Sequence, residues 1–193
     1  MLHIFLSNRP GDMKYGTTGK PVPGYEVKLT AEDGSPVAEG EIGDLWVKGP
    51  SAAFCYWNQR AKSMDTFHGP WTRTGDKYAV DADGFHTYQG RSDDMLKVSG
   101  IWVSPFEVEQ ALAAHDAVVE AAVVGRADHD DLIKPEAYVI LVEGREGDSA
   151  LQAELQAFVK EHLAPYKYPR WIRFVKELPK TATGKTQRFK LRD

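Results

Sequence analysis

Gly90-Arg91-Ser92-Asp93-Asp94 is a polar stretch near the middle of this 193-residue chain, and the sequence changes character across it. Short extended runs separated by Gly and Asp turns come before it, whereas longer helix-like and strand-like patterns come after it. Boundaries between domains commonly fall in such polar segments. The sequence therefore predicts two domains, at residues 1–91 and residues 92–193.

The part before this stretch predicts a small sheet that curls like a barrel. Apolar and polar residues alternate there as in half-buried strands, and Asp81-Ala82-Asp83-Gly84 has the composition of a hairpin turn. Short strands joined by such turns are typical of small barrels. We expect strands over residues 25–30, 43–48, 77–80 and 85–89, and a short helix over residues 58–67.

The part after the stretch predicts a three-stranded sheet with flanking helices. Ser104-Pro105-Phe106-Glu107 combines a capping box with proline at the first helical position, so a helix should run from there to about Ala114. Ser149 and Gln152 indicate a second capped helix. We expect strands over residues 117–124, 136–142 and 171–175. The predicted fold class is α+β, with a short-stranded β-barrel-like subdomain followed by a small α+β domain.

The composition is that of a globular protein without a membrane segment. Hydrophobic residues make up 42% of the chain, the net charge is -4, and no apolar run approaches the length that spans a bilayer. The single cysteine excludes an intrachain disulfide and favours a reducing compartment, so we expect a cytoplasmic protein. Cys55 lies in an aromatic run, Phe54 to Trp57, which we interpret as core packing.

The C-terminal end is the most basic part of the chain and carries a lysine on a small-residue turn, Pro179-Lys180-Thr181-Ala182-Thr183-Gly184-Lys185. Residues 166–192 hold nine Lys or Arg and one acid, Glu177. Such a segment suits phosphate or carboxylate oxygens, although a solvated tail lysine is the plainer interpretation. A P-loop is excluded, since that motif needs glycine where Pro179 stands. A non-catalytic nucleic-acid-binding module is disfavoured, because aromatic residues do not interleave with the charges.

Asp76, in the run Thr72-Arg73-Thr74-Gly75-Asp76, could accept hydrogen bonds from both hydroxyls of a ribose, and Arg91 could brace the sugar or a nearby phosphate. A plain turn residue is the alternative for Asp76. Asp93 and Asp94 could hold a metal or form an acid–base pair, but successive residues rarely point into one site, and a solvated linker is favoured. No histidine has metal-ligand spacing and no nucleophile elbow occurs, so we expect no metal site.

Five segments in this order resemble the C-terminal third of the adenylate-forming acyl-CoA synthetases, most closely the benzoate–CoA ligases. The resemblance covers essentially the whole chain, and five segments in register make chance a poor explanation. The segments are Tyr15 to Gly24, Gly40 to Gly49, Trp71 to Asp76, Gly90 to Gly100 and Pro179 to Lys185.

The resemblance implies that a carboxylic acid and Mg-ATP give an acyl-adenylate and pyrophosphate, and that coenzyme A then displaces AMP to form a thioester. In such an enzyme Asp76 and Arg91 hold the nucleotide, Asp93 is the hinge of a small mobile domain, and Lys185 bridges the carboxylate and the α-phosphate. Lys97, Ser99, Gly100 and Trp102 lie on the loop that serves the thioester step. His3 and Ile4 edge the acid pocket.

Members of that family are more than twice as long as this chain. The phosphate-binding loop and the magnesium ligands of the family lie upstream of Met1, so the resemblance implies a fragment, inactive alone, whose partner is the missing part of the large domain. Residues 1–91 would be the last subdomain of that domain. The alternatives are another acyl-CoA synthetase or a peptide-synthetase adenylation domain. By analogy with some relatives, Lys185 is also a candidate substrate for a lysine acetyltransferase.

Overall fold

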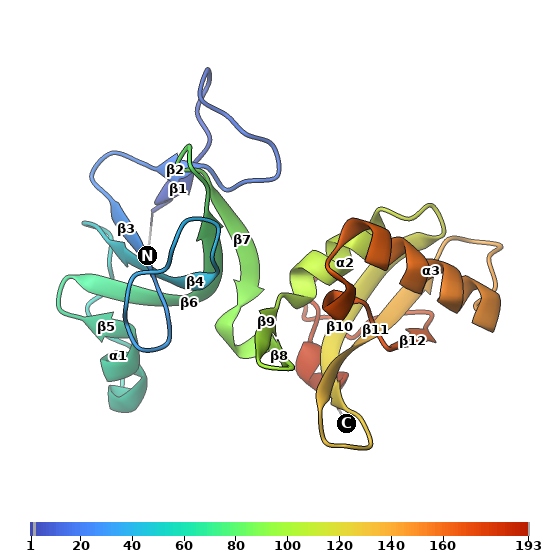
Figure 1. Cartoon of the computed structure of the whole chain (residues 1–193). Helices are drawn as coiled ribbons and strands as arrows, with labels where there is room; N and C mark the ends of the chain where they lie inside the picture. The colour runs from blue at the N-terminus through green and yellow to red at the C-terminus, as the bar shows by residue number, and fades with distance from the viewer. Residues whose placement is uncertain (2, 193) are drawn as a thin grey trace. The chain divides into compact units, whose positions relative to one another are not determined.

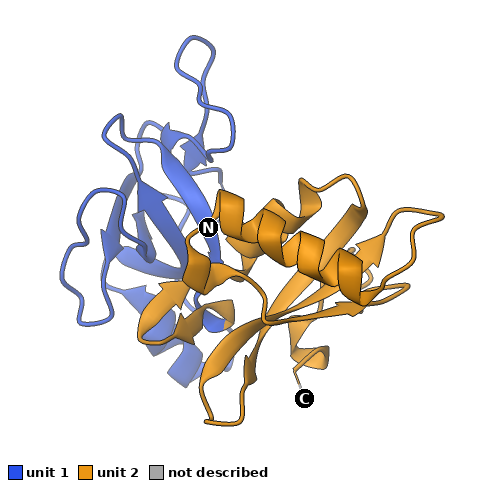
Figure 2. Cartoon of the chain, turned by 45° about the vertical axis from the view of Figure 1, so that its right-hand side comes forward, with its two compact units in different colours: residues 1–93 blue, residues 94–193 orange. Residues whose placement is uncertain are grey.

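The chain folds into two compact units, residues 1–93 and residues 94–193 (Figures 1 and 2). The structure is a computed structural model that describes residue 1 and residues 3–192. The observed division lies between Asp93 and Asp94, and the sequence places it after Arg91.

Unit 1 is built on an antiparallel five-stranded sheet. Four of its strands follow the order β3-β4-β6-β5, and the fifth strand, β7, also pairs with β6. Leu6, Leu29, Leu45, Val47 and Tyr78 form its buried core. The strands and the helix of unit 1 are β1 (Leu6–Ser7), β2 (Lys20–Pro21), β3 (Glu26–Thr30), β4 (Gly43–Lys48), α1 (Arg60–Thr66), β5 (Phe67–His68), β6 (Trp71–Val80) and β7 (His86–Arg91). The four predicted strands and the short helix are all present.

The turn between β6 and β7 shows why the chain reverses where the sequence predicts. Asp81 Oδ1 accepts hydrogen bonds from the backbone N–H groups of Asp83 and Phe85, and Gly84 has a φ of +83°, which only glycine adopts readily. Lys14 Nζ, in the loop between β1 and β2, lies 2.6 Å from Asp81 Oδ2 and so connects that loop to the turn. From this turn the strands pair in one register as far as Tyr78 and Tyr88, and a one-residue shift beyond them places Asp76 opposite Arg91.

The prediction that Cys55 packs in the core is wrong. Cys55 is exposed, and Phe54 and Trp57, the first and last residues of the run, are 96% and 92% exposed. The run lies in the irregular segment between β4 and α1, in which Asn58 has a φ of +52°. Its aromatic residues therefore belong to no strand of the sheet. Aromatic content alone therefore gave a misleading signal of burial here.

Unit 2 contains a three-stranded sheet of order β10-β11-β12, antiparallel and then parallel. Helices α2 and α3 cover one face of it (Figure 1), where Val108 and Leu155 join the core. Leu178 packs against the other face. The elements are β8 (Leu96–Val98), β9 (Ile101–Val103), α2 (Pro105–Ala113), β10 (Val118–Ala127), β11 (Ile133–Leu141), α3 (Ser149–His162) and β12 (Trp171–Phe174), with short 3-10 turns η1 (Ser92–Asp94, at the unit boundary), η2 (Pro165–Lys167) and η3 (Arg188–Lys190). The α+β fold class is confirmed.

The two helix starts differ in how well the sequence located them. Ser104 Oγ accepts from the backbone N–H of Glu107, so the predicted cap of α2 is correct. The cap of α3 is Asp148 rather than Ser149, because the Asp148 carboxylate accepts from the N–H of Leu151 at 2.8 Å. A carboxylate at this position also interacts favourably with the positive end of the helix dipole. Among the described residues, no helix combines the length and the apolar character needed to cross a membrane.

Candidate functional site

Asp76 and Arg91 face each other across the antiparallel pair β6–β7. Their Cα atoms are register partners, and Arg91 Nη1 donates to Asp76 Oδ1 at 3.0 Å. The Asp76 side chain is a quarter exposed, so the pair is open to a ligand while the surrounding strands hold its backbone. A polar ligand with two adjacent hydroxyls can meet an ionised carboxylate and a guanidinium here.

Gly75 lets Arg91 approach the strand closely. Gly75 has a φ of +76°, and a Cβ at that position would lie 2.9 Å from Arg91 Nη2. The backbone conformation therefore favours glycine, and a Cβ here would force the flexible Arg91 side chain to move from its place. The guanidinium lies over the turn in β6 because no side chain fills that space.

A cleft of about 210 Å³ adjoins this pair, entirely within unit 1. Its polar lining has both signs of charge, which suits a ligand that carries a phosphate and hydroxyl groups. Sequence reasoning missed Tyr56, which lies in the irregular segment before α1, and also Lys62 and Asp65, because the sequence of α1 gives no pattern that would place them near β6. The lining includes Tyr56, Lys62, Asp65, Arg73, Gly75, Arg91 and Asp93.

A buried carboxylate, Asp44, connects this cleft to the end of unit 1. Asp44 Oδ2 accepts from Arg73 Nη2 at 2.9 Å, Oδ1 lies 3.0 Å from Lys77 Nζ, and the Ser92 hydroxyl donates to Oδ1 at 2.8 Å. Burial on its own raises the pKa of Asp44, but the hydrogen bonds from Lys77, Ser92 and Arg73 outweigh it and hold the pKa below its ordinary value. Sequence reasoning missed this residue because its partners are 29 to 48 positions away.

Asp93 and Asp94 point to different partners. Asp93 lines the cleft of unit 1, whereas the carboxylate of Asp94 accepts from Arg188 Nη1 at 3.3 Å and from Arg192 Nη2 at 2.7 Å. The solvated-linker prediction is therefore wrong for Asp94, because arginines from the chain end neutralise it. The expectation that successive acids serve separate sites agrees with this geometry.

Lys185 directly follows an ordered turn of unit 2 at residues 182–184, and its side chain is exposed. The Thr181 N–H donates to the Lys185 carbonyl at 2.8 Å, and Thr181 Oγ1 accepts from the Lys185 N–H. Gly184, with a φ of +82°, closes the turn. The ammonium group is thus presented to solvent on a hydrogen-bonded support.

The Lys97–Trp102 segment is a tight hairpin made by β8 and β9. Ser99 and Gly100 both have positive φ, at 50° and 85°, as the central residues of a type I′ turn do. Lys97 and Trp102 are register partners, and Lys97 Nζ lies 5.3 Å from the centre of the Trp102 ring. This hairpin belongs to unit 2, whereas Asp76 and Arg91 belong to unit 1.

His3 and Ile4 line a separate cavity of about 400 Å³ in unit 1, together with Phe5, Thr18 and Tyr78. The His3 ring stacks on Tyr25 at 5.5 Å between centroids, and His3 Nδ1 lies 2.6 Å from the Ile4 carbonyl oxygen. Burial raises the pKa of Tyr78, whose hydroxyl meets Thr18 Oγ1 at 3.4 Å. The cavity is lined mainly by apolar side chains, and Thr18 and Tyr78 add hydroxyl groups to its lining.

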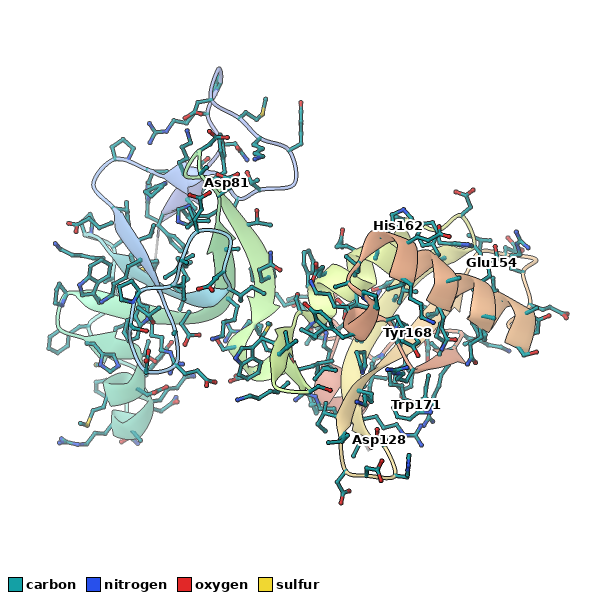
Figure 3. The ribbon with its side chains drawn as sticks, in the orientation of Figure 1. Asp81, Asp128, Glu154, His162, Tyr168 and Trp171 are labelled. Atoms are coloured by element: carbon teal, nitrogen blue, oxygen red, sulfur yellow. The ribbon has the colours of Figure 1, made fainter. Side chains whose placement is uncertain are left out.

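One group of potential metal ligands occurs among the described residues, in the turn between β10 and β11, where Figure 3 labels Asp128. Ligand atoms of Asp128, His129 and Asp130 lie within 4.8 Å of one another. Asp128 Oδ1 already accepts from the N–H groups of Asp130 and Leu132 and so shapes the turn. We assign no ion to this group.

Two family models match the sequence. Residues 1–57 match the AMP-binding enzyme model, and residues 107–185 match the AMP-binding enzyme C-terminal domain. Together they cover parts of both units.

Individual relatives agree with these models. The chain is 62% identical to a benzoate–CoA ligase of Thauera aromatica over 193 residues, which is 100% of this chain and 37% of that protein. A crystal structure of an anthranilate–CoA ligase in complex with anthranoyl-AMP superposes with a TM-score of 0.92 at 56% identity, covering 98% of this chain and 37% of that one. A benzoate–CoA ligase from Burkholderia xenovorans gives a TM-score of 0.91 at 60% identity, covering 100% and 38%. The chain therefore spans little more than a third of the length of its relatives.

Proposed function

We propose, since this chain belongs to the AMP-binding, adenylate-forming enzyme family, that the whole protein containing it is an ATP-dependent aromatic acid–CoA ligase. A carboxylate oxygen attacks the α-phosphate of ATP, and pyrophosphate leaves with the electron pair of the broken P–O bond. The thiol of coenzyme A then attacks the acyl carbon, AMP leaves, and the thiol proton passes to solvent or a base. An aromatic, benzoate-type acid is the substrate that the similarity to benzoate–CoA ligases favours.

The observation that carries the proposal is the Asp76–Arg91 pair at the edge of the charged cleft. In the proposed role, Asp76 accepts hydrogen bonds from the ribose hydroxyls of ATP and AMP. Arg91 pairs with the Asp76 carboxylate and adds a donor to the same nucleotide. The strand pairing supports this role because it holds both groups before the nucleotide arrives.

Lys185 is proposed as the catalytic cation of the adenylation step. Attack of a carboxylate on a phosphate ester brings anions together, and an ammonium close to both oxygens stabilises the developing charge. The exposed position of Lys185 on its turn supports this role. Asp93, at the junction of the two units, is proposed as the hinge that brings the small domain, residues 94–193, to and from the nucleotide.

The remaining residues are proposed for the second step and for the acid. Lys97, Ser99, Gly100 and Trp102 would face the pantetheine arm of coenzyme A after the domain rotates, and the exposed Ser99–Gly100 turn of the β8–β9 hairpin suits that role. His3 and Ile4 would edge the acid pocket, supported by the apolar cavity they line. Magnesium enters with ATP as part of the substrate. In the β10–β11 turn Asp128 Oδ1 already accepts from two backbone N–H groups, so we assign no magnesium ion to the group there.

The proposed partners are small molecules and the remainder of the large domain. ATP and coenzyme A are cytoplasmic substrates, which supports a cytoplasmic location. Because Lys185 is exposed, we also propose it as a site for a lysine acetyltransferase, since acetylation removes the charge that adenylation needs. Incubation with such an enzyme followed by peptide mass mapping tests this, and an unmodified Lys185 would reject it.

Pyrophosphate release by the whole protein tests the proposed reaction. Benzoate should give faster release than an aliphatic acid or an amino acid of similar size, and benzoyl-CoA should form only when coenzyme A is present. Faster release with an aliphatic or amino acid would place the protein with another acyl-CoA synthetase or a peptide-synthetase adenylation domain. No release with any acid would contradict the proposal.

A further inference from the structure

The residue before Asp93 is bound into unit 1. The Ser92 hydroxyl donates to the Asp44 carboxylate at 2.8 Å, and Asp44 is itself 3% exposed and held by Arg73 and Lys77. These contacts come from β4 and β6, the central strands of the sheet. Ser92 is therefore fixed to the central strands of the unit 1 sheet.

The residue after Asp93 is bound into unit 2 by an arginine that is itself anchored. Arg188 contacts Asp94, and it also donates from Nε and Nη2 to both oxygens of Glu109 at 3.0 and 2.6 Å. Glu109 is 7% exposed on α2 and accepts from the Val123 N–H of β10. This bidentate pair in the interior holds Asp94 to the helix and the sheet of unit 2.

We propose that Asp44 and Arg188 are positioning residues that clamp the two neighbours of Asp93, each into its own unit, so that rotation between the units is confined to the backbone of Asp93. The proposal rests on the domain rotation in the proposed function and adds to it two residues distant from the hinge in sequence. Each clamp is made within one unit, so rotation need not break either of them. Hinges commonly consist of a few residues that absorb the whole backbone change.

Arg188 also links the pivot to the proposed catalytic lysine, which is three residues earlier in the chain. The turn that carries Lys185 is fixed on its other side by buried Leu178 and by the ion pair of Lys180 with Glu120 at 2.7 Å. The lysine is thus supported from both sides by unit 2. A rotation at Asp93 then determines where the ammonium goes, because the turn moves as part of the unit.

Distance measurement between two spin labels tests the clamps in the full 193-residue chain, without substrate. One label goes on Cys55, the single cysteine, which is exposed in unit 1, and the other on an Ala153→Cys substitution in exposed α3 of unit 2. The test variants are Ser92→Ala, which removes one hydroxyl, and Arg188→Gln. Arg145→Gln, an exposed arginine of unit 2, is the matched control.

The distance distribution should broaden in Ser92→Ala and in Arg188→Gln and stay unchanged in Arg145→Gln. An unchanged distribution in Ser92→Ala would overturn the proposal. The Arg188→Gln variant leaves the buried Glu109 without its charged partner, and if it fails to fold, the Ser92→Ala result decides alone. In the whole protein the Ser92→Ala variant should adenylate about tenfold more slowly, as expected for the loss of one hydrogen bond to a charged group. The label measurement needs no catalysis, so it fails or succeeds independently of the ligase assay.

Discussion

Arg91 Nη1 lies 3.0 Å from Asp76 Oδ1 because β6 and β7 pair these two residues directly across the sheet. The residues are fifteen positions apart, and they become partners only through a one-residue shift of the β6–β7 register between Lys77 and Tyr78, beyond the hairpin turn at Asp81 to Gly84. An ionised carboxylate has about four lone-pair sites, so Asp76 can accept from Arg91 and from a ribose at the same time. The proposed ribose site therefore depends on the register of β6 and β7.

Replacing Asp76 by alanine should weaken AMP binding to the whole protein. Two hydrogen bonds from ribose hydroxyls to a carboxylate would be lost, and each contributes roughly one factor of ten, so the affinity should fall about a hundredfold. Isothermal titration with AMP measures this. Asp83→Ala, an exposed carboxylate in the β6–β7 turn, is the control. Equal affinity in the two variants would exclude the ribose role.

Gly75→Ala should weaken AMP binding more than Gly69→Ala does. Both glycines have positive φ, at 76° and 60°, so both substitutions strain the backbone. Only at Gly75 does the new Cβ meet a functional group, 2.9 Å from Arg91 Nη2, whereas at Gly69 nothing lies within 4 Å. Titration with AMP, alongside thermal unfolding, separates the two effects. A similar loss of affinity in both variants would show that strain alone is responsible.

The contribution of Asp44 to the free energy of unfolding should depend on pH. Its pKa is lowered in the folded state, so the stabilisation by the ionised carboxylate is present above its unfolded value of 3.8 and is lost as the pH falls through the folded value. Asp44→Asn should therefore be less stable than the wild type by about 3 kcal/mol at pH 7, as for a broken buried ion pair. The difference should shrink below pH 3.8.

Urea unfolding of the two proteins at pH 7 and at about pH 3 measures this difference. Asp83→Asn, at an exposed position, serves as the control and should change stability by less than about 0.5 kcal/mol at either pH. A stability difference for Asp44→Asn that is the same at both pH values would contradict the account of Asp44.

The sequence located the strands and most helix boundaries because those signals are local. Alternation along residues 25–30 and the Asp–Gly turn before Phe85 depend only on neighbouring residues, and the structure contains both. The cap of α3 is Asp148, one residue before the predicted Ser149. Both residues have side chains that commonly cap helices, so the sequence did not distinguish between them. The prediction that Cys55 is buried was wrong because the exposure of a residue depends on where its whole segment lies in the fold.

The site was only partly predictable for the same reason. Asp76, Arg91 and Lys185 were identified from runs with a distinctive local composition. Asp44 and Glu109 act through partners 48 and 79 positions away, Ser92 and Arg188, and no local pattern reports such contacts. The roles of all these residues remain proposals that the experiments above address.

The most direct test of the account is the effect of Lys185→Ala on the two half-reactions of the whole protein. A cation about 4 Å from the developing charge contributes roughly 4 kcal/mol at an effective dielectric constant of about 20, so adenylation should slow about a thousandfold. Thioester formation from supplied benzoyl-adenylate should be nearly unchanged. Lys180→Ala, on the same turn but paired with Glu120, is the control. Equal loss of both half-reactions in Lys185→Ala, or no loss in either, would contradict the account.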